Sequence, residues 1–370
     1  MIRVLQVMGG MNRRGAETFI MNIYRKIDRT KVQFDFLVYT DEKQDYEDEI
    51  VSLGGRVIHM PCEAGIKALF SISKFKQVMH DNGPYHIIHI QTLLNSMWPL
   101  LALPKKSRIL RIVHSHNTHN KSIMSGAQSL YEKIAKYVIR TRTQVMLACG
   151  EEAGEYLFGE KFSNEGIVLN NGIDLDIHAV CNEHAVATIR EEYDLNDKLV
   201  IGNVARFNEV KNHPFMVRIA KVLKKSGVKF RMLFVGNGPD ESTIRQFVQE
   251  HDLEKEIIFT GLRSDISDLM FTFDVFLMPS HFEGNPVTLV EAQAAGLPCV
   301  ISDVITDKID MGLGLINKCS LQDSPSVWAD AITNVSKRRY KDIDMIRKQF
   351  QICGYDAQTT ADKLISIYER

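Results

Sequence analysis

Short apolar runs alternate with amphipathic stretches along the whole chain. The first run, residues 2–8 (IRVLQVM), ends at Gly9 and Gly10, and residues 16–27 follow with apolar positions at helical spacing. Further runs of the same kind predict strands at 32–39, 56–60, 86–90, 109–116, 145–149 and 166–170. Most of the intervals leave room for a crossover helix, which is typical of a parallel sheet covered by helices. Residues 1–173 are therefore predicted to form one doubly wound α/β domain.

The pattern restarts after a polar stretch. An apolar run at 199–207 (LVIGNVARF) opens a second series of alternating strands and helices. The predicted strands are 229–238, 256–261, 274–280 and 297–303, and the predicted helices are 211–227, a segment from Asp240, and 285–296. We expect an interdomain segment at 174–198, a second doubly wound domain at 199–350 and a terminal amphipathic helix within 351–370. Because open α/β sheets bind ligands beyond the carboxyl ends of their strands, a cleft between the two domains is the expected ligand site.

The charge balance excludes some partners and suggests another. With 45 Lys and Arg against 46 Asp and Glu, the chain has a net charge of −1 and no global field that would gather nucleic acid. Residues 67–142 contain 12 Lys and Arg but only 2 acids, a net charge of +10. Basic clusters attract anionic lipid, so this segment is predicted to contact the anionic inner face of a membrane, helped by Trp98, Leu100, Leu101 and Leu103. Ordinary solvated helix faces are the alternative interpretation.

The start of the chain and its cysteines indicate the compartment. The apolar run before Gly9 is too short for the hydrophobic region of a signal peptide. No apolar stretch approaches the roughly 18 residues that a membrane span needs. The six cysteines are scattered and form no CxxC pair, which is typical of reduced core residues. We therefore expect a cytoplasmic protein that is peripheral at the membrane.

The segment 279–298 (PSHFEGNPVTLVEAQAAGLP) carries the most specific chemistry. Glu283 is expected in a loop with Gly284. A helix is expected to begin near Pro286, since proline is favoured at the first helical position, and Glu291 would then lie on its first turns. Free N–H groups at a helix start bind phosphate, and carboxylates accept hydrogen bonds from sugar hydroxyls. The segment could therefore hold a sugar, a diphosphate and a ribose, and two solvated acids beside a helix are the alternative.

Two cations follow the first strand of the second domain. Arg206 comes directly after this strand, and Lys211 follows five residues later at a predicted helix start. Both would lie at the carboxyl edge of the sheet, where a guanidinium and an ammonium could neutralise a leaving diphosphate. Charged residues at strand ends are also common on protein surfaces, so the sequence leaves both interpretations open.

Taken together, these motifs resemble those of the retaining glycosyltransferases of family 4. The resemblance rests on ARFNEVKNH, VGNGP, TGLRSDI and FEGNPVTLVEAQAAGLP, with NGID before the interdomain segment, and it extends in the family's order over nearly the whole chain. It implies the GT-B fold, in which two Rossmann-like domains face each other across a cleft. It also implies a terminal helix that crosses back to the first domain, and a reaction that needs neither a cofactor nor a metal ion.

The resemblance assigns roles to individual residues. Arg206 and Lys211 would hold the donor diphosphate and stabilise the departing nucleotide. Glu283 would contact the donor sugar, and Glu291 would bind the ribose hydroxyls. The other implied donor-binding positions are Gly10 and Gly15 in the N-terminal loop, Gly236, Leu262 and Arg263 near the base, and Gly284, Asn285, Pro286 and Val287 near the phosphates and the sugar.

Histidines gather at two strand ends of the first domain. They are His86, His89, His114, His116 and His119. Imidazoles are common metal ligands, but no carboxylate accompanies these residues, and alternate residues of a strand point to opposite faces. A metal site is therefore not favoured. The resemblance implies instead that His116, or alternatively His114, hydrogen-bonds the donor sugar.

Two DxD sequences could also suggest a metal, since this motif occurs in metal-dependent glycosyltransferases of the other common fold. Residues 174–176 fall in the interdomain turn, and residues 342–344 fall in a predicted surface helix. Neither ends a strand, so both are interpreted as solvated acids.

The resulting hypothesis is a retaining glycosyltransferase. It would move a sugar from a nucleotide-diphosphate sugar, with UDP favoured, to a hydroxyl of a growing, lipid-linked precursor in capsule or exopolysaccharide synthesis. The alternatives are a nucleotide-sugar epimerase of similar architecture, a catalytically silent scaffold of a polysaccharide assembly complex, and a two-lobed solute-binding protein. The last would need export, for which the chain start shows no signal.

Overall fold

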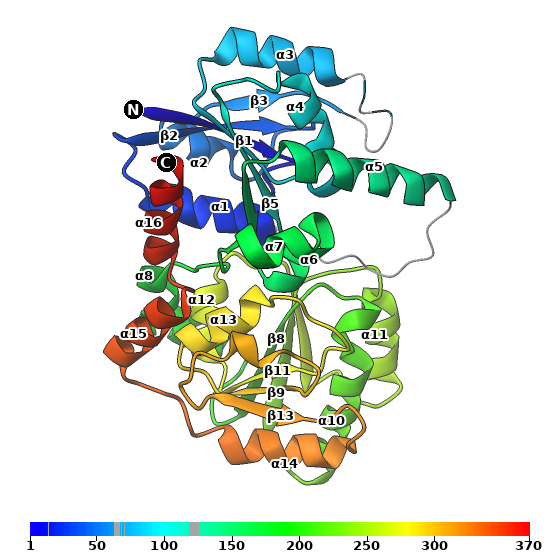
Figure 1. Ribbon diagram of the computed structural model, residues 1–370. Coiled ribbons are helices and arrows are strands. Elements are labelled where there is room, and N and C mark those ends of the chain that lie inside the picture. Colours follow the sequence, from blue (N-terminus) through cyan, green and yellow to red (C-terminus); the bar gives the residue numbers. More distant parts are fainter. Residues whose placement is uncertain (14, 63–66, 68, 70, 118–125) are drawn as a thin grey trace. The chain divides into compact units, whose positions relative to one another are not determined.

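The computed structural model describes residues 1–13, 15–62, 67, 69, 71–117 and 126–370. His119 lies outside these residues. The chain divides into two compact units, of which unit 1 is residues 1–172 with 357–370 and unit 2 is residues 173–356 (Figure 1). Each unit is built around one parallel sheet, as the alternation of apolar runs and amphipathic stretches predicts.

Unit 1 contains a seven-stranded parallel sheet in the order β3-β2-β1-β4-β5-β6-β7. The strands are β1 Ile2–Met8, β2 Val32–Val38, β3 Val57–His59, β4 Ile87–Ile90, β5 Leu110–Ser115, β6 Val145–Ala148 and β7 Ile167–Val168. Consecutive residues of a strand enter different cores, since Val4 packs in one hydrophobic cluster and Leu5 in another. Both faces of the sheet are therefore buried, which is why its strands read as nearly continuous apolar runs.

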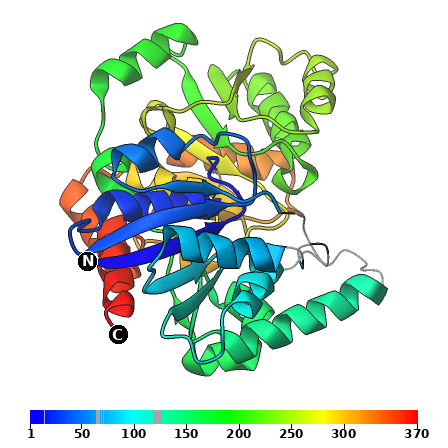
Figure 2. The same cartoon turned by 90° about the horizontal axis from the view of Figure 1, so that it is seen from above.

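Helices cover the sheet of unit 1. They are α1 Gly15–Lys26, α2 Glu47–Ser52, α3 Ser71–Asn82, α4 Met97–Ala102, α5 Gly126–Arg142, α6 Glu151–Phe158, α7 Glu160–Glu165 and α16 Ala357–Tyr368, with a 3₁₀ turn at Leu93–Ser96. The terminal helix α16 lies beside α1, although the two are separated by most of the chain (Figure 1 and Figure 2). It buries Ala361, Leu364 and Tyr368 in the same core as α1. Unit 1 is thus completed by the last residues of the chain.

Unit 2 contains a six-stranded parallel sheet in the order β10-β9-β8-β11-β12-β13. The strands are β8 Leu199–Val204, β9 Phe230–Val235, β10 Ile257–Gly261, β11 Val275–Met278, β12 Cys299–Ser302 and β13 Ile316–Cys319. Its helices are α8 Leu175–His178, α9 Glu183–Glu192, α10 His213–Lys225, α11 Glu241–Gln249, α12 Ile266–Thr272, α13 Val287–Ala294, α14 Pro325–Val335 and α15 Ile343–Cys353, with 3₁₀ turns at Glu209–Lys211 and Asp307–Ile309. The prediction of two doubly wound Rossmann-like sheets is confirmed.

In each sheet the strand order reverses once, between β1 and β4 in unit 1 and between β8 and β11 in unit 2. At such a point the crossover connections leave in opposite directions, so the loops beyond the carboxyl ends of the two strands leave room for a ligand. Gly9 and Gln91 follow the two strands in unit 1, and Arg206 and Ser280 lie just beyond those in unit 2. Each of these strand edges carries candidate site residues of its own unit.

Some expectations differ from the structure. The strand β13 has no sequence prediction, because it is an edge strand of four residues in which Asn317 and Lys318 interrupt the apolar pattern. Asp174 was expected to be solvated, but it is buried and caps α8 by accepting a hydrogen bond from the Asp176 N–H at 3.0 Å. Cys181 is exposed, whereas Cys149 and the other buried cysteines fit the prediction of reduced core residues.

Three of the four apolar residues expected to help membrane contact lie in the core instead, and the fourth, Leu101, is half-buried. Trp98 and Leu103 are each 6% exposed, and Leu100 is fully buried. They pack with Phe75 and Phe158 in one of the two cores of unit 1, because α4 covers the sheet rather than standing on the surface. Among the described residues, no helix has both the length and the apolar character that crossing a bilayer requires.

Candidate active site

The loops that follow β8 and β11 are tied together at the edge of the unit 2 sheet. The two strands are neighbours in the sheet. The Asn203 side chain donates to the Leu277 carbonyl at 2.8 Å, and the His281 N–H donates to the Val210 carbonyl at 2.8 Å. The Asn212 side chain donates to the Pro279 carbonyl at 3.0 Å. These bonds fix the two loops relative to each other and bring their charged residues to one place.

Lys211, Ser280 and Glu283 form a polar cluster between these loops. Lys211 Nζ lies 2.6 Å from Glu283 Oε1, and the Ser280 hydroxyl donates to the same oxygen at 2.7 Å. The side chains of Lys211 and Glu283 are 21% and 9% exposed, so the pair is mostly desolvated. Ser280 is itself positioned, because its carbonyl accepts a hydrogen bond from the Ser302 hydroxyl on β12. The sequence did not single out Ser280.

Arg206 differs from Lys211 in being unpaired. Its side chain is exposed, and it makes no hydrogen bond or ion pair with any residue in the described part of the chain. It follows β8 and therefore lies at the same sheet edge as the lysine–glutamate pair. The edge thus offers one cation that is held by a carboxylate and one that is free to meet an anion.

The start of α13 supplies backbone donors at this edge. The helix begins at Val287, one residue later than expected, and Pro286 occupies the N-cap position. Proline has no side-chain acceptor that could cap this end, so the first N–H groups of the helix receive no hydrogen bond from the N-cap residue. A Cβ added to the exposed Gly284 would meet nothing within 4 Å, and Asn285 is half-buried beside it. An open loop that leads into an uncapped helix start is suited to phosphate.

Glu291 lies within α13 and faces a buried environment. Its side chain is 13% exposed, and burial raises the pKa of its carboxyl group to about 8. His178 from α8 places its Nε2 atom 3.9 Å from Glu291 Oε1. His178 lies in the stretch interpreted as an interdomain turn, and no motif marks it, which is why sequence reasoning missed it. The pair combines a protonatable carboxyl with an imidazole in a nearly closed setting.

The loops after β9 and β10 carry the three residues that the resemblance places near the nucleotide base, which are Gly236, Leu262 and Arg263. Gly236 has φ +134°, and a Cβ there would lie 2.1 Å from the Ala205 carbonyl, so only glycine fits between the loops. Leu262 is 74% exposed, which leaves an apolar surface free. The Arg263 guanidinium is engaged, because it binds both oxygens of Asp265 and also donates to the Tyr193 hydroxyl.

The corresponding edge of unit 1 holds the glycine-rich loop. Gly10 follows β1, and the Gln44 side chain accepts a hydrogen bond from the Met11 N–H and lies where a Cβ of Gly10 would be. Gly15 is the exposed first residue of α1. A cavity of about 310 Å³ lies beside this loop and is lined by Gly9, Gly10, Asn12, Glu17, Thr40, Glu42 and Gln44. Among the described residues, the lining offers carboxylates, amides and a hydroxyl but no cation, so the cavity is suited to hydroxyl groups rather than to phosphate.

A buried chain of hydrogen bonds holds His116 in unit 1. His116 Nε2 donates to Gln91 Oε1 at 2.8 Å, and Gln91 Nε2 donates to Gln6 Oε1 at 2.9 Å. Gln6 Nε2 then donates to the Tyr368 hydroxyl at 3.1 Å, and this hydroxyl donates to His89 Nδ1 at 2.8 Å. Burial lowers the pKa of both histidines to about 3, so both rings are neutral. The orientation of His116 therefore depends on a tyrosine of the terminal helix.

His114 lies between the other two rings and is not accessible. Its ring stacks on that of His116 with centroids 4.0 Å apart and on that of His89 with centroids 5.5 Å apart, and Phe19 meets it edge-on. Burial and the two neighbouring imidazoles lower the pKa of His114. Between the two histidines left open by the sequence, this enclosure favours His116. No group of three or more His, Cys, Asp or Glu among the described residues could hold a metal ion.

Two family models match the chain. "Glycosyltransferase Family 4" matches residues 13–177, and "Glycosyl transferases group 1" matches residues 186–308. A curated relative from Bacillus subtilis, "Putative glycosyltransferase EpsF", is 40% identical over 368 residues, which cover 99% of this chain and 96% of the relative. The "Capsular polysaccharide biosynthesis glycosyltransferase CapH" of Staphylococcus aureus is 24% identical and covers 92% of each chain.

Solved structures are similar over the whole length. The structure of Anabaena Alr3699/HepE in complex with UDP-glucose has a TM-score of 0.75 at 16% identity and covers all of both chains. Sucrose-phosphate synthase from Thermosynechococcus elongatus has a TM-score of 0.77 at 16% identity and covers 100% of this chain and 98% of that one. These similarities concern the fold.

Proposed function

Because this chain belongs to the family 4 glycosyltransferases, which have the GT-B fold, we propose that it transfers a sugar from a UDP-sugar to a hydroxyl of a growing polysaccharide precursor, with retention at the anomeric carbon and without a metal ion. The observation that carries this proposal is the cluster of Lys211, Ser280 and Glu283 beside the uncapped start of α13. It combines donors for a diphosphate with an acceptor for sugar hydroxyls at one sheet edge.

The donor diphosphate is bound by Arg206, Lys211 and the start of α13. Breaking the anomeric C–O bond leaves negative charge on the diphosphate, and these groups stabilise it more strongly as it grows. Arg206 reaches the anion without giving up a partner, whereas Lys211 exchanges Glu283 for phosphate. Glu283 is then free to accept hydrogen bonds from the donor sugar. The diphosphate takes up the proton of the acceptor hydroxyl as the sugar leaves.

Glu291 binds the ribose hydroxyls. In the free protein burial raises the pKa of this carboxyl to about 8. Hydrogen bonds from two ribose hydroxyls favour the ionised form, so donor binding releases a proton from Glu291. Leu262 and the loop around Gly236 pack against the base, while Arg263 acts through its ion pair with Asp265 by holding this loop in place.

Unit 1 contributes a neutral imidazole and two carboxylates. His116 uses Nε2 to donate to Gln91, and its buried Nδ1 atom has no hydrogen-bond partner among the described residues, so Nδ1 is the atom that would accept a hydrogen bond from a hydroxyl of the donor sugar. The cavity beside Gly9 and Gly10 receives the hydroxyl-rich acceptor rather than the donor, because its lining in the described part of the chain has carboxylates and no cation and would repel a phosphate. Glu17 and Glu42 are the carboxylates that orient this acceptor.

The names of similar proteins support the donor, the acceptor and the pathway in this proposal. The relatives include a capsular polysaccharide glycosyltransferase, and an Escherichia coli "UDP-Gal:alpha-D-GlcNAc-diphosphoundecaprenol alpha-1,3-galactosyltransferase" is 29% identical over 148 residues, 37% of this chain and 36% of that one. The proposal therefore includes a UDP-sugar as the donor and, as the acceptor, a lipid-linked precursor in capsule or exopolysaccharide synthesis. The epimerase and solute-binding alternatives are dropped, since the chain belongs to a glycosyltransferase family.

A peripheral contact of the basic segment 67–142 with an anionic membrane would bring the enzyme to such a precursor. Lys105, Lys106 and Arg108 are exposed, and each cation near an anionic surface contributes about 1 kcal/mol. Replacing all three by Glu is expected to abolish sedimentation with vesicles that contain phosphatidylglycerol. Unchanged sedimentation would remove membrane contact from the proposal.

The donor is tested by titrating the purified protein with UDP-, GDP- and ADP-sugars in the presence of EDTA. We expect one UDP-sugar to bind and to be hydrolysed slowly without an acceptor. A protein that binds none of them would leave a catalytically silent scaffold as the better description. A donor that binds only when a divalent cation is added would contradict the metal-independent reaction.

A further inference from the structure

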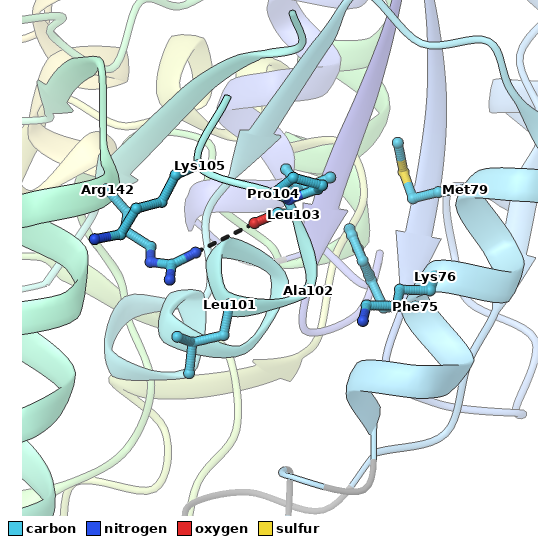
Figure 3. Close-up of a pocket in the computed structure, with 9 residues that line it drawn as sticks. All are labelled: Phe75, Lys76, Met79, Leu101, Ala102, Leu103, Pro104, Lys105 and Arg142. Carbon is cyan, nitrogen blue, oxygen red and sulfur yellow. Dashed lines mark hydrogen bonds between the residues drawn. The ribbon is translucent and has the colours of Figure 1, made fainter. Parts of the chain in front are cut away.

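Unit 1 has a second cavity, which the proposed reaction does not use. It has a volume of about 530 Å³, which is within the range of pockets that hold small molecules. Its lining comes from α3, from the end of α4 and the segment that follows it, and from the last residue of α5 (Figure 3). The residues that matter for its chemistry are Phe75, Lys76, Met79, Leu101, Lys105 and Arg142.

This cavity lies at the edge of the sheet where the strands begin. Arg111, the second residue of β5, donates to the Pro104 carbonyl in the lining. His116 directly follows the other end of the same strand, and at the rise of an extended strand the two residues are about 16 Å apart. The cavity is therefore separate from the glycine-rich loop and from His116.

The surroundings of the cavity have an excess of positive charge. Lys76, Lys105, Arg111 and Arg142 form this group of cations, and in the part of the chain that the structure describes none of them has a carboxylate within ion-pair distance. The two acids of segment 67–142 are occupied elsewhere, since Asp81 lies 3.0 Å from His80 and Glu132 lies 2.7 Å from Lys136.

The two guanidinium groups are held by the chain itself rather than by a counter-ion. Arg142 Nη1 donates to the carbonyls of Leu100 and Leu103, each at 3.2 Å, and Arg111 Nε donates to the Gln144 side chain at 3.1 Å. Burial lowers the pKa of Arg111, and the nearby charge of Arg142 lowers it further. Partly buried cations that repel each other without a carboxylate favour the binding of an anion.

The rest of the lining is apolar, which excludes a simple phosphate site. Figure 3 shows Phe75, Lys76 and Met79 on one side of the cavity, and Lys105 and Arg142 on the other. Phe75 is buried in the core, whereas Met79 and Leu101, near the end of α4, are half-buried. An occupant that satisfies both sides has an anionic group and a hydrocarbon part.

We propose that this cavity binds one phosphate-bearing membrane lipid, whose phosphate is held by Lys105 and Arg142 and whose acyl chain packs on Met79 and Leu101, while Lys76 adds positive charge on the opposite side of the cavity. The lipid would fix unit 1 at the bilayer through a defined site, apart from the donor and acceptor positions. This inference does not depend on the proposed reaction, since it concerns a different edge of the sheet. It adds a specific site to the general electrostatic contact of segment 67–142.

The test uses the full chain and a soluble lipid. Dihexanoyl phosphatidylglycerol, kept below the concentration at which it forms micelles, is titrated into the protein by calorimetry. Inorganic phosphate and dihexanoyl phosphatidylcholine are titrated in parallel, because the first lacks the chains and the second lacks the net negative charge. We expect one molecule of the anionic lipid to bind, at least tenfold more tightly than either comparison ligand.

Two double variants locate the site. Lys76→Glu with Lys105→Glu should weaken binding of the anionic lipid at least tenfold, while Lys74→Glu with Lys133→Glu, which makes the same change in net charge at exposed positions outside the lining, should change it less than twofold. Met79→Gln should weaken lipid binding several-fold and leave phosphate binding unchanged. Both double variants should keep donor hydrolysis at the level of the unmodified chain, which also shows that they fold.

Three results would overturn the proposal. The first is that inorganic phosphate binds as tightly as the anionic lipid. The second is that both double variants lose the same amount of lipid affinity. The third is that the anionic lipid does not bind. A chain that binds this lipid but no UDP-sugar would contradict the proposed function and leave the lipid site intact. A chain that hydrolyses UDP-sugar but does not bind this lipid would contradict the lipid site and leave the proposed function intact.

Discussion

The two sheet edges that carry the candidate site differ in their chemistry. In unit 2 the edge is charged and partly open, with an unpaired Arg206 and the pair of Lys211 and Glu283. In unit 1 the edge holds a neutral His116, which is fixed through Gln91 in a buried chain of hydrogen bonds, and a cavity whose charged lining residues, in the described part of the chain, are the carboxylates Glu17 and Glu42. Cations can stabilise negative charge that grows during a reaction, whereas a neutral imidazole and carboxylates can only orient hydroxyl groups. Substitutions in unit 2 should therefore affect the reaction rate most.

The largest effect is expected for Arg206→Ala. This arginine has no hydrogen-bond or ion-pair partner among the residues that the structure describes, so removing it leaves no described carboxylate unpaired and should not disturb folding. Loss of one donor to a developing anion typically costs about 100- to 1000-fold in kcat. Steady-state hydrolysis of the UDP-sugar measures this loss. A decrease of less than tenfold would mean that the charged edge does not stabilise the leaving diphosphate.

A smaller effect is expected for Tyr368→Phe in unit 1. The substitution removes the hydroxyl that links Gln6 to His89 and leaves buried groups unsatisfied, at a cost of about 1–3 kcal/mol in the free energy of unfolding. We expect kcat to fall roughly tenfold with little change in KM, because a small displacement of His116 lowers the reaction rate more than it lowers donor affinity. In a His116→Ala background the same substitution should have almost no further effect on kcat. Equal losses in both backgrounds would assign Tyr368 to folding alone.

Glu291→Gln should change the pH dependence of donor binding. Because the pKa of Glu291 in the free protein is raised to about 8, the carboxyl is mostly protonated at neutral pH, and the ionised form that accepts ribose hydroxyls gains population as the pH rises. Donor affinity should increase with pH and level off above about pH 8. In Glu291→Gln this slope should vanish, and affinity should fall by about threefold to tenfold above pH 8. A slope that persists in the variant would assign the proton to another group.

The raised pKa of Glu291 also predicts a stability trend. The folded protein holds this proton more tightly than the unfolded chain does, so the free energy of unfolding should decrease as the pH rises from about 4.5 to about 8. Thermal unfolding of the unmodified chain and of Glu291→Gln in this range separates the contribution of Glu291 from that of other groups. The variant should lose less stability across the range.

The smallest effect is expected at the DxD sequences. Asp176 is 65% exposed and pairs with Arg347 at 2.9 Å, and exposed ion pairs contribute about 1 kcal/mol or less. Asp176→Asn should therefore change kcat less than twofold, with or without EDTA. A large loss that added divalent cations reverse would indicate a metal at this position.

The fold could be predicted because both faces of each sheet are buried. Strands such as β1 and β11 then carry nearly continuous apolar runs, and these are visible in the sequence. The edge strand β13 was missed since only part of it is buried. The meeting of Lys211 and Glu283 could also be predicted in outline, because both follow parallel neighbouring strands.

Other parts of the site could not be predicted from the sequence. Tyr368 contacts His89, 279 residues earlier, because the terminal helix packs beside α1, and this packing depends on the shape of the whole unit rather than on a local pattern. The proximity of His178 to Glu291 likewise follows from the packing of α8 on α13. Trp98 was misplaced at the surface, since a short apolar helix that covers a sheet and one that meets a membrane have the same composition.

The most direct test of the central claim is the rate at which UDP is released from a UDP-sugar without an acceptor and with EDTA present, measured for three proteins. The account predicts slow release by the unmodified chain, a loss of about 100- to 1000-fold for Arg206→Ala, and an unchanged rate for Arg218→Ala, which removes an exposed arginine of α10 in the same unit. Release that is absent from the unmodified chain, or equal in all three proteins, would contradict it.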